Sequence, residues 1–276
     1  MELHVSLHRR LEHPTRLRLL SGVKWSSPEQ SLSRAGLRPG MRCLDVRCGV
    51  GQATLPMARL AGANGAVLGI DPEERLLVQA REEAERQGLR AEFRAGDISD
   101  LNEQGNFDLV YSRFLLSQRP SEQAEKALRQ MVRTAHPGGI IVLEDLECPG
   151  TIDAAGADNP VYTRFLELYM ALLREDQSEP SPGLQLPRLL EQVGIAGAQC
   201  SDSATSVDSS DHARNPVAQL LDSIHHAIVA AHLATRTEVK RLTSELEKFH
   251  MPPQSLFWMP RIVQAWGSVP SLGSGL

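Results

Sequence analysis

The sequence is poor in aromatic residues and in cysteine, and it has no long apolar run. Phe, Trp and Tyr together make up 4% of the 276 residues, and only four residues are cysteines. No apolar run approaches the length of a membrane-spanning helix, and the opening MELHVSLHRR contains no apolar core of signal-peptide length. The sequence therefore predicts a protein without a membrane span.

The cysteines and the charge exclude further classes. Cys43, Cys48, Cys148 and Cys200 show no metal-ligand spacing, so we expect no metal site and, by default, a reduced cytoplasmic setting. The formal net charge is −5, whereas nucleic-acid binding requires clustered Lys and Arg. The composition therefore argues against a nucleic-acid partner.

The chain does contain enough apolar residues for a large core, because hydrophobic residues make up 41% of it. Short apolar runs alternate with amphipathic helical patterns, which indicates a parallel sheet with helices between its strands. The predicted fold class is α/β, a doubly wound Rossmann-like, seven-stranded and mostly parallel sheet with helical cap insertions. Its strands are expected at residues 43–46, 66–70, 91–95, 107–111, 140–143, 195–205 and 261–266.

The predicted organisation has three parts. Residues 1–36 are expected to form an N-terminal helical cover, 37–148 the cofactor-binding half, and 149–276 the remainder of the sheet with a helical cap. We expect the cap at about residues 150–192 and 208–252. A predicted helix in this region is apolar on most of its faces, so it should be buried or lie over a ligand.

The segment from Met41 to Leu60, MRCLDVRCGVGQATLPMARL, indicates a binding turn. A buried strand is followed by a turn with Gly49 and Gly51 and then by a helix. Such a turn brings backbone N–H groups and the positive end of a helix to a ligand. A dinucleotide-binding fingerprint requires a third glycine, where this chain has Thr54, and it gives no role to the acid Asp45 before the turn.

A second pattern fits more of the chain. The motifs LDVRCGVG, GID, AGD, FDLVYSRFLL and HPGGIIVLED follow one another in this order. Between about Leu37 and Asp145 the chain resembles the class I methyltransferases that bind S-adenosylmethionine, especially the small-molecule branch with ubiquinone-pathway and natural-product enzymes. The resemblance implies methyl transfer to a small molecule, with S-adenosyl-L-methionine as cofactor.

The resemblance also implies roles for the matching residues. Asp45 would lie near the amino group of the cofactor, and the two glycines would let the backbone approach it. Asp71 would accept from both ribose hydroxyls. Asp97 and the backbone N–H of Ile98 would bind adenine. The same acids could instead be helix N-caps, which are common after a strand. Ser112 and Arg113 would face the methionyl chain and the reactive methyl group.

Arg47 departs from the family pattern, which has a glycine at this position. A residue with a Cβ there crowds the methionyl end or requires an unfavourable φ. One hypothesis is that Arg47 pairs with the cofactor's carboxylate. The other is that it weakens cofactor binding and that the protein serves another use.

Candidates for catalysis and substrate binding follow later in the chain. His225 is a candidate general base, although a histidine on an apolar helix face is more often a satisfied core residue. Glu144 (catalytic) and Asp145 (substrate-binding) follow the fifth strand, at the edge where doubly wound sheets bind ligands. An apolar lid over the site is expected to include Phe165, Tyr169, Ile224 and Trp258.

This lid predicts a mid-sized, largely apolar acceptor such as a quinone, polyketide or terpenoid, methylated on O, N or C. The same residues could instead be ordinary core between sheet and helices. Two alternatives stay open: a protein of this fold that binds the cofactor but catalyses a cyclisation or pericyclic rearrangement, and an NAD(P)-binding oxidoreductase.

Overall fold

The computed structural model describes residues 28–115, 121–147, 159–175, 182–203, 215–248 and 261–271. The chain divides into two compact units. The sheet unit comprises residues 26–146, 182–203 and 262–276, and the cap unit comprises residues 1–25, 147–181 and 204–261.

The sheet unit contains a seven-stranded sheet in the order β3-β2-β1-β4-β5-β7-β6. Strands β1 to β5 pair in parallel where their pairing is described, and β6 pairs antiparallel with β7. This confirms the predicted fold class. The strands are β1 (Arg42–Val46), β2 (Ala66–Asp71), β3 (Glu92–Ala95), β4 (Phe107–Arg113), β5 (Ala135–Glu147), β6 (Gln199–Ser203) and β7 (Arg261–Ser268).

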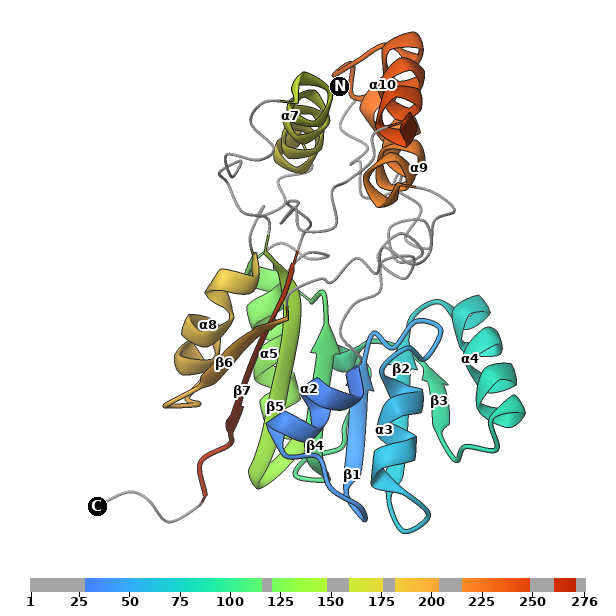
Figure 1. The fold of residues 1–276 in the computed structure, drawn as a ribbon. Coiled ribbons are helices and arrows are strands. Elements are labelled where there is room, and N and C mark those ends of the chain that lie inside the picture. Colours follow the sequence, from blue (N-terminus) through green and yellow to red (C-terminus); the bar gives the residue numbers. More distant parts are fainter. Residues whose placement is uncertain are drawn as a thin grey trace, which may run out of the picture. The chain divides into compact units, whose positions relative to one another are not determined.

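Helices cover both faces of this sheet (Figure 1). One face packs on α2 (Pro28–Ala35), α3 (Thr54–Ala61) and α4 (Glu74–Arg86). The other packs on α5 (Ser121–Thr134), α8 (Leu186–Gln192) and the short helix η2 (Ile98–Asp100). Side chains alternate between the faces along each strand, so Leu44 and Val46 belong to the second face and Cys43 and Asp45 to the first.

Two elements differ from the sequence-based expectation. The fifth strand, expected at residues 140–143, is longer: β5 already begins at Ala135 and shifts its register against β4 between Phe107 and Leu109. Helix α8 lies in the range expected for the cap, but Leu186 and Leu190 are buried in the core of the sheet unit. A short amphipathic pattern gives no information about which core its apolar face joins.

The described part of the cap unit consists of α7 (Pro160–Glu175), α9 (Pro216–Ala230) and α10 (Arg236–Lys248). Their apolar faces form one cluster, which includes Phe165, Leu221 and Leu242. The side chain of Asn215 caps α9 by accepting from the N–H groups of Val217 and Ala218.

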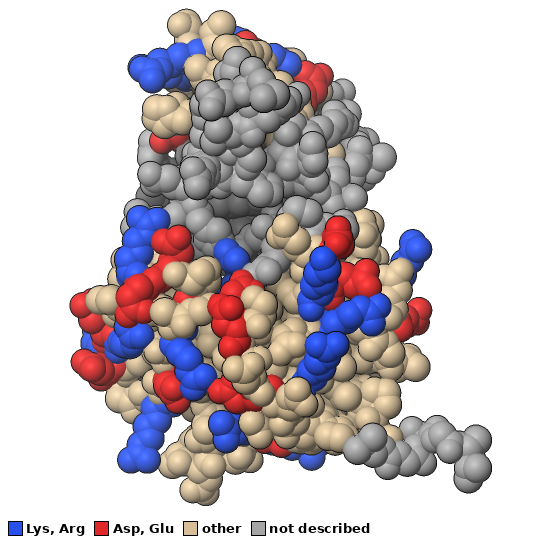
Figure 2. All heavy atoms as spheres, turned by 180° about the vertical axis from the view of Figure 1, so that it is seen from behind, with Lys and Arg blue, Asp and Glu red and all other residues tan. Residues whose placement is uncertain are grey.

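The described surface of the sheet unit carries charges of both signs. Figure 2 shows Lys and Arg side chains interspersed with Asp and Glu over this face. Ion pairs one helical turn apart occur on α5, where Lys126 pairs with Glu122 and Arg129 with Glu125. Of the helices that are described, none is both long enough and apolar enough to cross a membrane.

Candidate functional site

The turn after β1 is fixed against the neighbouring strand β2. The Cys48 N–H donates to the Ile70 carbonyl at 3.0 Å, and the Gly49 N–H donates to Oδ2 of Asp71 at 3.0 Å. Cys48 packs on Gly69, where an added Cβ would lie 2.9 Å from its Sγ. Gly49 and Gly51 have φ of 55° and 83°, in the region that favours glycine. The turn therefore presents its backbone at the carboxyl edge of the sheet.

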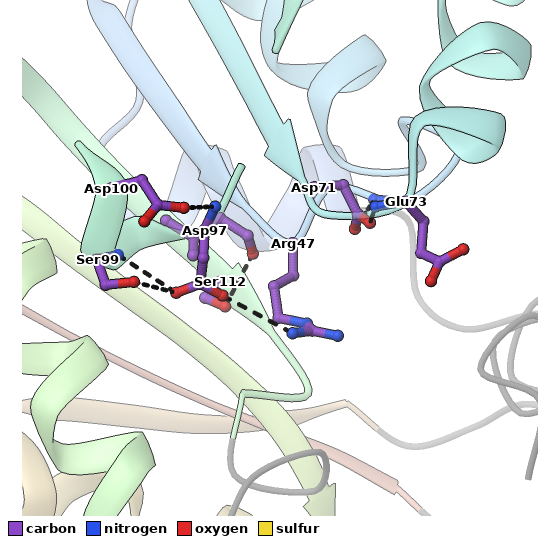
Figure 3. Close-up of polar contacts among 9 residues, drawn as sticks. Arg47, Asp71, Glu73, Asp97, Ser99, Asp100 and Ser112 are labelled. Atoms are coloured by element: carbon purple, nitrogen blue, oxygen red, sulfur yellow. Dashed lines mark hydrogen bonds and ion pairs between the residues drawn. The ribbon is translucent and has the colours of Figure 1, made fainter. Parts of the chain in front are cut away.

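Arg47 has a φ of 63°, which is unusual for a residue with a Cβ. Its guanidinium turns toward the segment after β3, where Nη1 lies 4.0 Å from Oδ2 of Asp97 (Figure 3). The Arg47 side chain is 14% exposed and that of Asp97 23%. The unfavourable φ expected from the sequence is thus present, and Arg47 is directed to the residue predicted to bind adenine.

Asp45 is a buried acid at the end of β1. It is 2% exposed, and Oδ2 accepts a hydrogen bond from the Thr54 hydroxyl at 2.6 Å. Burial raises the pKa of Asp45 from 3.8 to about 7, and the hydrogen bond from Thr54 opposes this rise. A cation brought beside this carboxyl would favour its ionised form.

Asp71 ends β2 and is also buried. Oδ2 accepts from the Gly49 N–H at 3.0 Å, and Oδ1 accepts from the Glu73 N–H at 2.9 Å (Figure 3). Each carboxylate oxygen can accept a second hydrogen bond. The side chain therefore joins the turn to the start of α4 and retains capacity for two hydroxyl groups.

Asp97 follows β3 and is the N-cap of η2. Its side chain accepts from the Ser99 N–H, and its own N–H donates to Asp100, so the N-cap interpretation is realised for this acid. Asp97 also lines a cavity of about 590 Å³, together with Ile70, Gly96 and Asp100. This volume is in the range of small-molecule sites. Ile98, the residue after Asp97, is buried.

A buried polar cluster joins the ends of β4, β5 and β7. The Tyr111 hydroxyl donates to Oε2 of Glu144 at 2.6 Å, and the Gln264 amide donates to Oε1 at 3.1 Å. Nε of Arg113 lies 3.3 Å from the same Oε2. Glu144, Gln264 and Tyr111 are at most 3% exposed. Burial and the nearby charge of Glu144 raise the pKa of Tyr111 well above its usual value, so its hydroxyl stays a donor.

Sequence reasoning missed Tyr111 and Gln264. The signal for Tyr111 is present, because it precedes Arg113 by two residues and must share its face of β4. Gln264 had no such signal. Since both oxygens of Glu144 already accept from buried donors, its contacts favour a positioning role over the predicted catalytic one.

The remaining residues near these strand ends are also buried. Ser112 points to the other face of β4 and donates from Oγ to the Val46 carbonyl at 3.0 Å. Asp145 follows Glu144 on β5 and is fully buried. In the described parts of the chain, no group of three His, Cys, Asp or Glu side chains could hold a metal ion.

The residues predicted for the lid lie within the cap unit's own core. Phe165, Tyr169 and Ile224 are all buried in the cluster of α7, α9 and α10. The Phe165 and Tyr169 rings stack with centroids 6.1 Å apart. Trp258 is outside the described residues. His225 is half-buried on α9, and its Nδ1 is paired with the Asp222 carbonyl.

Together, the sheet order, the glycine turn and the acids at successive strand ends define a cofactor-binding α/β protein of the class I methyltransferase type. A family model described as "Methyltransferase domain" matches residues 37–191. The chain belongs to this family, as a methyltransferase that uses S-adenosylmethionine. The family and the cofactor implied by the sequence motifs are thereby confirmed.

A curated relative and two solved structures are similar to this chain. A demethylmenaquinone methyltransferase of Bacillus cytotoxicus is 27% identical over 175 residues, which cover 59% of this chain and 73% of the relative. Phosphoethanolamine N-methyltransferase 2 of Haemonchus contortus, in complex with S-adenosylhomocysteine, matches 90% of this chain and 53% of its own at 17% identity and a TM-score of 0.53. The [4+2]-cyclase SpnF matches 97% of this chain and 96% of its own at 18% identity and a TM-score of 0.58. The two structural matches share the fold.

Proposed function

We propose that this protein transfers the methyl group of S-adenosylmethionine to a mid-sized, largely apolar small molecule. The observation that carries the acceptor class is the match over 175 residues to a methyltransferase named for demethylmenaquinone. A quinone is therefore the first acceptor class to test, with polyketides and terpenoids next. The attacked atom is O, N or C.

Several described residues support this proposed cofactor placement. Gly49 and Gly51 would let the turn backbone approach it, and Asp71 would accept from the ribose hydroxyls with its remaining capacity. Asp97 and the Ile98 N–H, beside the cavity of about 590 Å³, would hold adenine. The other proposed contacts, at the methionyl end, are those of Asp45, Ser112 and Arg113.

Arg47 forms an ion pair with Asp97 that conflicts with this placement. Its guanidinium lies 4.0 Å from the Asp97 carboxylate, where the adenine amino group would bind. The ion pair has to loosen when adenine reaches Asp97, so Arg47 competes with the cofactor in this arrangement. The alternative is that the side chain swings to the cofactor's carboxylate.

Methyl transfer is an in-line displacement at carbon, and the cofactor supplies the activated methyl group. The chain's own task is to align the acceptor and to exclude water. The pattern of contacts leaves Glu144 unsuited to abstract a proton from an acceptor, since Tyr111, Gln264 and Arg113 surround its carboxylate. His225 remains the proposed general base, and Asp145, Phe165, Tyr169, Ile224 and Trp258 the proposed acceptor contacts.

Product mass spectrometry tests the proposal. Purified protein is incubated with S-adenosylmethionine and, separately, a demethylated quinone, a polyketide and a terpenoid alcohol. A product in which a methyl group replaces one hydrogen, and which is therefore heavier by one CH2, is expected together with an equivalent of S-adenosylhomocysteine and a released proton. A product of unchanged mass with altered chromatographic retention would instead support the rearrangement alternative. The variant His225→Gln should lower the rate with an O–H or N–H acceptor and leave cofactor affinity unchanged.

A further inference from the structure

Arg113 is the cation at the polar end of β4, and its ion-pair partner within the described ranges is Glu144. Val46 on β1 is in register with Ser112 on β4, so Arg113 lies beside the first residue of the turn. Its side chain is 11% exposed, and its guanidinium carbon is 5.2 Å from the centre of the Phe114 ring. The guanidinium is thereby held between an aromatic ring and the Glu144 carboxylate.

Two atoms of the cluster lack hydrogen-bond partners. The Nε–H of Arg113 is 3.3 Å from Glu144 Oε2 but outside hydrogen-bond geometry, and it is buried without an acceptor among the described residues. Oε1 of Gln264 is likewise buried without a donor in the described part of the chain. A buried cationic donor without an acceptor is costly and rare, so the Arg113 guanidinium retains capacity for an acceptor such as a carboxylate, whereas the Gln264 oxygen requires a donor.

The charges on this face match an amino-acid group. Asp45 is in register with Tyr111, so Asp45 and Arg113 lie on the same face of two neighbouring strands, and Arg113 acts electrostatically on Asp45. A zwitterion carries an ammonium and a carboxylate on one carbon. An acid on β1 and a guanidinium on the neighbouring strand β4 supply the opposite charges.

We propose that Arg113 binds the carboxylate of the cofactor's methionyl end, and that Glu144 positions Arg113 for this contact. The inference rests on the proposed placement of the methionyl end beside β1 and β4. Glu144 anchors the guanidinium because Tyr111 and Gln264 fix both of its oxygens. The role assigns carboxylate recognition to Arg113 instead of Arg47, whose guanidinium is paired with Asp97.

Calorimetric titration with two ligands tests this role. S-adenosylmethionine and its decarboxylated analogue share the adenosine, the sulfonium and the amine and differ by the carboxylate alone. The unmutated protein is expected to bind the analogue roughly 10- to 100-fold more weakly, as for the loss of a charge-assisted hydrogen bond. Arg113→Gln should bring the ratio of the two dissociation constants close to one, chiefly by weakening S-adenosylmethionine.

Further variants separate positioning from folding. Glu144→Gln should lower the ratio of the two dissociation constants to a value between those of the unmutated protein and Arg113→Gln. In the Arg113→Gln background, Glu144→Gln should not change this ratio further. Arg113→Lys keeps the charge and should retain part of the ratio. Arg129→Gln, an exposed arginine on α5, is the matched control and should leave the ratio unchanged. A purely structural role of Glu144 would weaken both ligands equally, because the ratio is measured within one protein sample.

Three results would overturn the inference. They are equal binding of the two ligands by the unmutated protein, an unchanged ratio in Arg113→Gln, and a collapse of the ratio in Arg47→Gln instead. Absence of S-adenosylmethionine binding by the unmutated protein would overturn the proposed cofactor site as well. If the unmutated protein binds S-adenosylmethionine but does not distinguish it from the decarboxylated analogue, the inference about Arg113 fails and the cofactor site stands.

Discussion

Replacing Asp45 by Asn should stabilise the ligand-free protein at alkaline pH and weaken its cofactor binding. Asn is nearly isosteric and can still accept the hydrogen bond that the Thr54 hydroxyl donates at 2.6 Å. It cannot ionise, so the cost of burying a charge at this site disappears. The stability gain should therefore depend on pH.

The size and sign of the effect follow from the pKa of Asp45. Burial raises it from 3.8 to about 7; Asp71 and Glu144 add to the rise, and Arg113 and Thr54 oppose it. Because the folded state holds the proton of Asp45 more tightly than the unfolded state, Asp45 contributes most to the free energy of unfolding below about pH 4. This contribution is lost as the pH rises through 7. Roughly three pH units correspond to about 4 kcal/mol between the two limits.

Urea denaturation of ligand-free protein at pH 4.5 and pH 8.5 measures this difference. The stability of Asp45→Asn relative to the unmutated protein should be higher at pH 8.5 than at pH 4.5, by up to about 4 kcal/mol. Glu82→Gln is the control, since it removes the same charge from an exposed position on α4. The reasoning fails if Asp45→Asn destabilises the protein equally at both pH values. Saturating S-adenosylmethionine should reduce the stability difference at pH 8.5, because the proposed ammonium contact favours the ionised carboxyl.

Three other predictions concern the turn and the opposite edge of the sheet. Gly69→Ala should lower both thermal stability and cofactor affinity, because its Cβ would lie 2.9 Å from the Cys48 Sγ; Cys48→Ala should restore part of both, and no rescue would contradict this contact. Arg47→Gly should stabilise the protein by about 1 kcal/mol by removing a side chain from a left-handed conformation. The same variant should tighten S-adenosylmethionine binding if Arg47 competes at Asp97, and weaken it if Arg47 is a ligand. His136→Gln should destabilise the protein more at pH 6 than at pH 9. The pKa of His136 is raised by the Pro137 carbonyl and by Asp108, so the stabilisation by its protonated form is lost as the pH rises through that pKa; equal losses at the two pH values would contradict the linkage.

Much of the fold could be predicted from the sequence because its signals are local. Apolar runs bounded by acids and glycines marked β1, β2 and β4 to within two residues. Gly49 and Gly51 indicated a turn, and both have a positive φ in it. The full extent of β5 was not predictable, because Pro137 and the two glycines after it are turn residues that the sheet accommodates by a register shift.

The cap residues show where local signals end. The apolar faces of α7 and α9 are apparent in the sequence, and Phe165, Tyr169 and Ile224 were expected over a substrate. They are buried in the core that the cap helices form with α10. An apolar helix face indicates that the face will be buried, but the packing of the whole unit determines which element covers it.

The sequence by itself determined the family motifs, the strand–turn–helix around Met41 to Leu60, and the acids Asp45, Asp71 and Asp97 at the ends of successive strands. Only the tertiary structure decided what those acids and their neighbours contact. It directed Arg47 to Asp97, and it surrounded Glu144 with Tyr111, Arg113 and Gln264. The physical reason is that a sequence pattern gives the face of a strand on which a side chain lies, whereas its partner across the sheet depends on strand order and register, which long-range packing sets.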